Sequence, residues 1–182
     1  MKNIEDHGLK LHPEELNNKF GWSGEYTIIK KNVVTGKIIK VINVKNLITN
    51  LGLDEIIKAL SSGIDMQLAY LAIGDSSLAE AASQTTLDNE IFRVPILAKT
   101  KTGTGQLQST ALLLADEPDY APYNGVCTVR EIGIFCGSAA LTWNGGAGKD
   151  TGLMISRIVI TAEAKVATEE FQFTRTDLFS RV

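Results

Sequence analysis

Residues 68–97, LAYLAIGDSSLAEAASQTTLDNEIFRVPIL, contain the pattern that decides the fold. An apolar run over residues 68–73 stops at Gly74-Asp75, and a loop of small and polar residues follows over residues 76–88. This pattern predicts a strand that leads into a long, exposed loop. Loops of this kind on a rigid β scaffold commonly carry the contacts of a protein.

The end of the same stretch predicts a second strand. Phe92, Val94 and Ile96 share one parity, whereas Arg93 and Pro95 share the other. Because successive side chains of a strand point to opposite faces, we expect one buried face and one face that carries the arginine.

Further strands are expected along the whole chain. Two β-rich runs between Gly24 and Val44 are separated by Thr35-Gly36, which predicts a β-hairpin. Both faces of this hairpin are partly apolar, which indicates burial on both sides or a contact between subunits. The remaining strands are expected at residues 106–114, 126–136, 153–162 and 168–175, and polar turns or loops at residues 99–105, 115–125 and 137–152.

One segment has helical periodicity. Four apolar residues recur with the spacing of one helical face: Leu53, Ile56, Ile57 and Leu60. Asn50 is expected to cap the start of this helix, and Gly63 to end it. We expect the helix to close one edge or end of the β core.

These elements predict a mainly β fold with a single domain. The 182 residues, of which 44% are hydrophobic and 21% charged, suffice for one substantial core. About eight strands, one short α-helix and three long loops are typical of an antiparallel β-sandwich, similar to a jelly roll. We expect this domain over residues 21–182, preceded by an N-terminal arm or linker over residues 1–20.

Charge and hydropathy exclude two kinds of partner. The net charge is −3 and the lysines are dispersed, whereas a nucleic-acid-binding protein normally carries a basic stripe. No apolar run approaches the roughly 18–20 residues that span a bilayer. The charged N-terminus lacks the apolar segment of a secretory signal. We therefore expect no bound nucleic acid, no membrane insertion, and folding in a cytosol.

The two cysteines, Cys127 and Cys136, are expected to be buried thiols. Nine residues of one strand separate them by about 30 Å and place them on opposite faces, whereas a disulfide needs Cα atoms within about 7 Å. No CxxC spacing exists, and His7 and His12 lie far away in the sequence. We therefore expect no metal site.

The glycine-rich segment GGAGKDT, residues 145–151, is only superficially similar to a phosphate-binding P-loop. That motif needs a glycine where Trp143 stands and a serine or threonine where Asp150 stands. No helical pattern follows to offer its N-terminus to a phosphate. A loop between two strands is the better interpretation.

Catalytic chemistry has two conceivable sources in this sequence. A glycoside hydrolase would need two carboxylates about 5–9 Å apart. The acidic residues that border the long loops are Asp75, Asp88, Glu90, Asp116, Glu117 and Asp119. Acids at loop bases are also common for turn formation and solubility. A nucleophile–histidine site is disfavoured, because both histidines lie in the arm and a general base needs fixed geometry.

Three loop aromatics, Trp143, Tyr120 and Tyr123, are candidates for contact with a glycan or another protein. Exposed aromatics stack on sugars and act as hot spots of interfaces. They can equally fold back and cover the core.

Charged residues inside otherwise apolar strands form a second group of candidates: Glu90, Arg93, Arg130, Glu131 and Arg157. A buried charge is costly unless it is paired and hydrogen-bonded. These side chains therefore form paired networks within the domain, or they meet partners across a subunit boundary.

Several of these residues also resemble a known family. The order LAIGDSS…TTLDNEIFRVPI and then VREIGIFCG is similar to that in structural proteins of tailed bacteriophages and prophages, such as tail-collar fibre and baseplate-associated proteins. The segment NLITNLGLDEI at residues 46–56 resembles the piece that precedes such cores. The matching residues are Gly74, Asp75, Leu87, Asn89, Glu90, Arg93, Arg130, Glu131, Gly133 and Phe135.

The resemblance implies a non-enzymatic virion structural protein that forms a symmetric oligomer and needs no cofactor. We expect a tail subunit of the collar, fibre-adaptor or baseplate type. The alternatives are a head fibre or capsid-decorating protein, a carbohydrate-binding module that contacts a host glycan, and a polysaccharide-cleaving enzyme. The expected partners are copies of the chain and other virion proteins, with residues 1–20 as the docking arm and the loops 75–88, 115–125 and 138–151 as contact surfaces.

Overall fold

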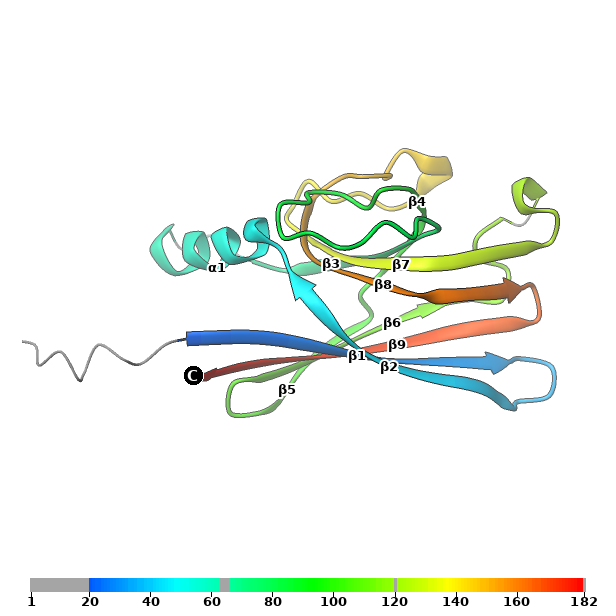
Figure 1. The fold of residues 1–182 in the computed structure, drawn as a ribbon, viewed down its shortest axis with the longest axis horizontal. Helices are drawn as coiled ribbons and strands as arrows, with labels where there is room; N and C mark the ends of the chain where they lie inside the picture. The colour runs from blue at the N-terminus through cyan, green and yellow to red at the C-terminus, as the bar shows by residue number, and fades with distance from the viewer. Residues whose placement is uncertain (1–19, 63–65, 120, 182) are drawn as a thin grey trace, which may run out of the picture.

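The computed structural model describes residues 20–62, 66–119 and 121–181. The described chain forms nine strands and one α-helix (Figure 1). The elements are β1 (Phe20–Asn32), β2 (Ile38–Ile48), α1 (Asn50–Ser62), β3 (Leu68–Gly74), β4 (Glu90–Pro95), β5 (Ala98–Gly103), β6 (Gln106–Leu113), β7 (Val126–Cys136), β8 (Leu153–Val166) and β9 (Glu169–Arg181). The expected arm at residues 1–20 lies outside the described residues, except for Phe20, which begins β1.

The nine strands form one antiparallel sheet with the order β4-β3-β7-β8-β2-β1-β9-β6-β5. The sheet curls so that β4, β3, β7 and β8, here called the upper layer, lie over β2, β1, β9, β6 and β5, the lower layer (Figure 1). Strand β2 joins the layers, because it pairs with β1 along most of its length and with β8 only at Leu47 and Ile48. The expected mainly β, antiparallel fold with one helix is confirmed. The expected sandwich of two separate sheets is not confirmed, because the nine strands form one continuous sheet.

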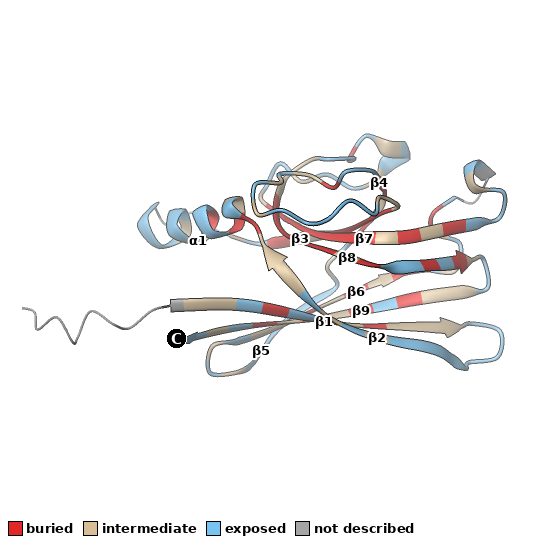
Figure 2. Ribbon diagram, in the orientation of Figure 1, coloured by how far each residue is buried: buried red, intermediate tan, exposed pale blue. Residues whose placement is uncertain are grey.

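The hydrophobic core lies between the two layers, where Figure 2 shows buried residues on facing strands. The lower layer contributes Tyr26, Ile28, Ala111, Leu113, Phe171 and Phe173. The upper layer contributes Leu71, Ile73, Ile91, Val94, Ile132, Ile134, Ile155 and Ile158. The predicted hairpin between residues 24 and 44 is confirmed as the β1–β2 pair of the lower layer.

The upper layer is buried on its outer side as well. Leu87, from the loop between β3 and β4, packs there against Ala72, Phe135 and Met154. This second covering explains why Arg93 of β4 is 2% exposed. The face that carries Arg93 is therefore buried as well, because the loops of residues 75–89 and 137–152 cover it.

Strand β5 corrects a second expectation. The polar segment at residues 99–105 was expected to form a turn, but residues 98–103 pair with β6 as the edge of the lower layer. Its residues are almost all exposed. Hydrogen bonding to β6, which hydrophobic periodicity does not report, therefore makes this segment a strand.

Helix α1 lies where it was predicted, but it does not have the predicted cap or packing. Thr49, rather than Asn50, caps it, because the Gly52 amide donates to Thr49 Oγ1 at 3.0 Å. Gly52 and Glu55 are its buried residues. The apolar stripe faces solvent, since Leu53, Ile57 and Leu60 are 47%, 62% and 80% exposed. The stripe therefore does not cover the β core, and the predicted end at Gly63 lies outside the described residues.

Replacing Gly52 with alanine tests the close approach of α1 to β8. Alanine normally stabilises a helix by up to about 1 kcal/mol over glycine, but a Cβ here would lie 2.5 Å from the Ile155 carbonyl oxygen. We expect Gly52→Ala to lower the free energy of unfolding by about 1–3 kcal/mol in chemical denaturation. The control Ser61→Ala, exposed in the last turn, is expected to change it by less than about 0.5 kcal/mol. A Gly52→Ala chain as stable as the parent would contradict this packing.

Candidate functional site

The central charged residues lie on the outer side of the upper layer, where two buried arginines each hold one loop. Arg157 of β8 binds the loop of residues 75–89, here called the β3–β4 loop. Arg93 of β4 binds the loop of residues 137–152, the β7–β8 loop. Both arginines are 2% exposed or less.

Arg157 makes four hydrogen bonds, to the β3–β4 loop and to Glu131. Its Nε donates to Glu131 Oε2 at 2.9 Å, and its Nη2 donates to Asp88 Oδ2 at 2.7 Å. The other guanidinium bonds reach Gln84 Oε1 at 2.9 Å and the Leu78 carbonyl at 3.0 Å. A buried cation is costly unless it has carboxylate partners and hydrogen bonds of this kind.

Glu131 fastens the end of the same loop. Its two carboxylate oxygens accept the backbone amides of Asp88 at 3.1 Å and Asn89 at 2.8 Å. The position of Gly74 requires glycine, because a Cβ there would collide with the Glu131 carboxylate and the Asn89 carbonyl. One glutamate therefore joins β7, β8 and the β3–β4 loop.

Arg93 and Glu90 make the second connection. The guanidinium donates from Nε to Glu90 Oε1 at 2.6 Å and from Nη2 to Glu90 Oε2 at 2.7 Å, a bidentate pair. Its Nη1 donates to the carbonyl of Thr151 at 2.9 Å, and Glu90 accepts the Asp150 amide at 3.0 Å. The ring of Phe135 lies 4.6 Å below the guanidinium carbon. The β7–β8 loop is thus attached to an edge strand.

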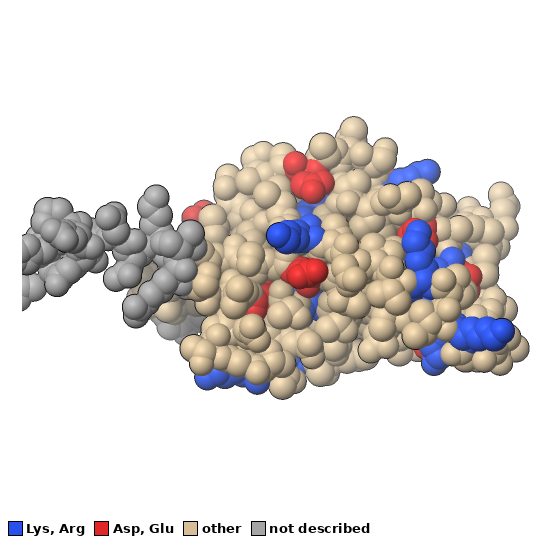
Figure 3. Space-filling view, turned by 60° about the horizontal axis from the view of Figure 1, so that its bottom comes forward, with Lys and Arg blue, Asp and Glu red and all other residues tan. Residues whose placement is uncertain are grey.

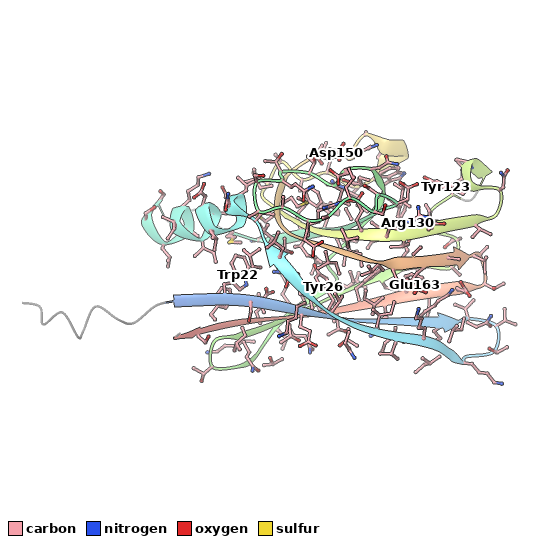
Figure 4. The ribbon with its side chains drawn as sticks, in the orientation of Figure 1. Trp22, Tyr26, Tyr123, Arg130, Asp150 and Glu163 are labelled. Carbon is pink, nitrogen blue, oxygen red and sulfur yellow. The ribbon has the colours of Figure 1, made fainter. Side chains whose placement is uncertain are left out.

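Arg130 does not pair with its neighbour Glu131. It is half-buried, and its Nη1 donates to the carbonyl of Asp75 at 3.1 Å. Figure 4 labels Arg130 on β7. Of the five charged residues singled out in the sequence, four form two buried ion pairs, and Arg130 contributes one bond at the rim.

The loop aromatics are not brought together. Trp143 is half-buried and packs on Phe92, with ring centroids 5.4 Å apart. Tyr123 packs against the core at the other end of β7, where burial raises the pKa of its hydroxyl. Tyr120 lies outside the described residues. Trp143 therefore covers a strand rather than extending a platform toward solvent.

A third buried charge cluster lies between the layers and was missed in the sequence. Arg175 donates to Asp177 Oδ1 at 3.1 Å from Nε and to Ser156 Oγ at 2.7 Å from Nη1. Trp22 Nε1 donates to the same aspartate oxygen at 2.8 Å, and Figure 4 shows Trp22 between the layers. The parity of Phe171 and Phe173 continues through residues 175 and 177, so strand alternation could have identified this cluster.

Lys165 of β8 was also missed. Its buried Nζ donates to the carbonyls of Leu114 and Glu117, each at 2.6 Å. Burial lowers the pKa of this amine to about 8. The lysine anchors the start of the loop between β6 and β7, and no pattern in the sequence distinguishes it from exposed lysines.

Both cysteines are free and buried, as expected. They lie in the same core, which corrects the expectation of opposite faces. A register shift between Val129 and Glu131 inverts the alternation of β7 midway along the strand. Burial raises the pKa of both thiols to about 11, so they remain protonated at neutral pH.

The acidic residues of the central loop are engaged within the domain. Asp88 and Glu90 bind the two arginines, and Asp75 Oδ1 accepts Asn89 Nδ2 at 2.6 Å. Glu117 accepts the Leu114 amide at 2.9 Å. Among the described residues, no group of three or more His, Cys, Asp or Glu side chains has the arrangement of a metal site. Helix α1, the α-helix of the described residues, is not long and apolar enough to cross a membrane.

Comparison with known proteins adds no relative: no protein-family model, curated protein or solved structure matches this chain.

Substitutions of Arg157, which is buried, and Arg130, which lies at the rim, are expected to lower the free energy of unfolding by very different amounts. We expect Arg157→Met to lower the free energy of unfolding by about 3–5 kcal/mol, because Glu131 and Asp88 lose their buried cation. The matched control is Arg130→Met, which removes one bond at a half-exposed position and is expected to cost about 1 kcal/mol or less. Chemical denaturation measures both values. Equal losses would contradict the assignment of Arg157 as the residue that secures the loop.

Proposed function

We propose that this chain is a non-enzymatic structural subunit of a tailed-bacteriophage virion, placed in the tail as a collar, fibre-adaptor or baseplate component. It assembles with copies of itself and with other virion proteins as a symmetric oligomer. The rival interpretation as a carbohydrate-binding module gains no support from Trp143, which packs on Phe92.

The residues that resemble phage structural proteins support the proposal by their place in the fold. Glu90 and Arg93 form one buried ion pair, and Glu131 forms the other with Arg157. Gly133 lies under Leu87, where a Cβ would be 2.9 Å from that side chain. The resemblance therefore covers residues that fix the architecture, which suits a family defined by assembly rather than by a reaction.

The observation that carries the proposal is the apolar surface that a single chain leaves uncovered. On α1 this surface consists of Leu53, Ile57 and Leu60. On the β1–β2 hairpin it consists of Val33, Val34, Ile38, Ile39 and Val41, which are 42–76% exposed. Groups of large exposed apolar side chains are typical of interaction sites. Contact with neighbouring subunits would remove these aliphatic side chains from water, which the isolated chain does not do.

A double substitution on α1 tests this proposal. We expect Ile57→Asp with Leu60→Asp to reduce incorporation into gradient-purified particles at least about 10-fold, because each carboxylate would have to be desolvated at the subunit contact. Quantitative mass spectrometry of the particles measures the stoichiometry.

The matched control is Ser61→Asp, which adds a negative charge to the same turn without removing apolar surface. It is expected to incorporate like the parent chain. Absence of the parent chain from purified particles would contradict the virion assignment. Normal incorporation of the double variant would contradict only the role of α1.

A further inference from the structure

The outer side of the lower layer has a central area without charged side chains. Its residues alternate with the core residues of the same strands, so they all point away from the upper layer. The members of this uncharged face are Thr27, Ile29, Val41, Asn43, Ala98, Thr100, Gln108, Thr110, Leu112, Gln172, Thr174 and Thr176. All of them are half-buried or exposed.

Charges occur only at the ends of this face, where they balance. Glu25 lies opposite Lys45 in the β1–β2 pair at one end. Lys31 forms an ion pair with Glu170, 3.2 Å apart, at the other. Figure 3, in which the underside of Figure 1 is turned forward, shows the charged side chains in separate groups with wide uncharged areas between them. In a chain with 21% charged residues, such depletion resembles the centre of a protein interface.

The face also has unused hydrogen-bonding capacity. Thr27 Oγ1 donates to Asn43 Oδ1 at 2.9 Å. The other hydroxyl and amide side chains of this face, such as Thr174 and Gln108, make no side-chain hydrogen bond to another described residue. Hydroxyl and carboxamide groups can each donate and accept. They can therefore pair with identical groups, which carboxylates or ammonium groups cannot do.

Together with its charged ends, this face approaches the size of a stable contact between subunits. Five strands about 4.8 Å apart, and the nine residues of β9 from Glu170 to Leu178 at about 3.4 Å each, cover roughly 700 Å², an area that includes the charged pairs Glu25–Lys45 and Lys31–Glu170. A standard interface buries about 800 Å² per partner. The projecting stripe of three residues on α1 is much smaller.

We propose that a second copy of this chain packs on the uncharged face, sheet against sheet, about a two-fold axis. In such a contact each patch meets itself, so a face with net charge would repel its copy, whereas this face is neutral and self-complementary. Sheets packed in this way lie about 10 Å apart. The inference rests on the proposed function, because it names the self-association surface of the proposed assembly.

Substitution of Thr174, which lies between Thr27 and Thr110 at the centre of the face, tests this contact. Sedimentation equilibrium of the full chain is expected to give twice the chain mass of 19.7 kDa, or an even multiple of that mass. Thr174→Arg is expected to weaken this association at least about 100-fold, because two like charges would meet across the axis. Gln172→Arg, at an already exposed position, is expected to act in the same way, and circular dichroism verifies the fold of each variant.

Thr142→Arg is the matched control, because it adds the same charge to the exposed part of the β7–β8 loop on the opposite layer. It is expected to keep the parent mass. A parent chain that remains at 19.7 kDa at the highest concentration overturns the inference, as do folded Thr174→Arg and Gln172→Arg chains that associate like the parent. A monomeric parent chain that still enters particles would leave the proposed function intact. A chain that forms a dimer but is absent from particles would support this contact and contradict the proposed function.

Discussion

The contact between Arg157 and Glu131 is the constraint on which the upper layer depends. Two opposite charges with no solvent exposure lie on neighbouring strands, and neither can be left alone at a tolerable cost in free energy. Their remaining hydrogen-bonding groups are satisfied by the β3–β4 loop. The loop is therefore a required part of the folded state, although its residues 77–81 are exposed.

The distribution of side chains departs from the usual division between a polar exterior and an apolar interior. Three arginines, Arg93, Arg157 and Arg175, are buried with their carboxylate partners, whereas large aliphatic side chains on α1 and the β1–β2 hairpin face solvent. The buried pairs fix the loops, and the lower layer adds a broad uncharged face. Loops fixed by buried ion pairs, combined with uncovered apolar surface, suit a subunit that buries this surface against other subunits in an assembly.

Sequence periodicity predicted most strands, the hairpin and the position of the helix, because these features depend on local periodicity. It left open whether Arg93 pairs within the domain or across a subunit boundary, because alternation cannot show that a distant loop covers the second side of a strand. It placed Cys127 and Cys136 on opposite faces, because a register shift within β7 is invisible in a regular pattern. The charged residues of the site were recognised, whereas their partners Asp88, Gln84 and Thr151 depend on how two long loops fold back, which no local pattern encodes.

Native-state hydrogen exchange of the Asp88 and Asn89 amides tests the central role of Glu131 most directly, because both amides donate to this one carboxylate. If the buried pair makes the β3–β4 loop part of the cooperative core, both amides exchange with a free energy of opening within about 1 kcal/mol of that of the slowest amides in β7. Exchange of Asp88 and Asn89 as fast as that of the exposed Glu80 amide would contradict this account.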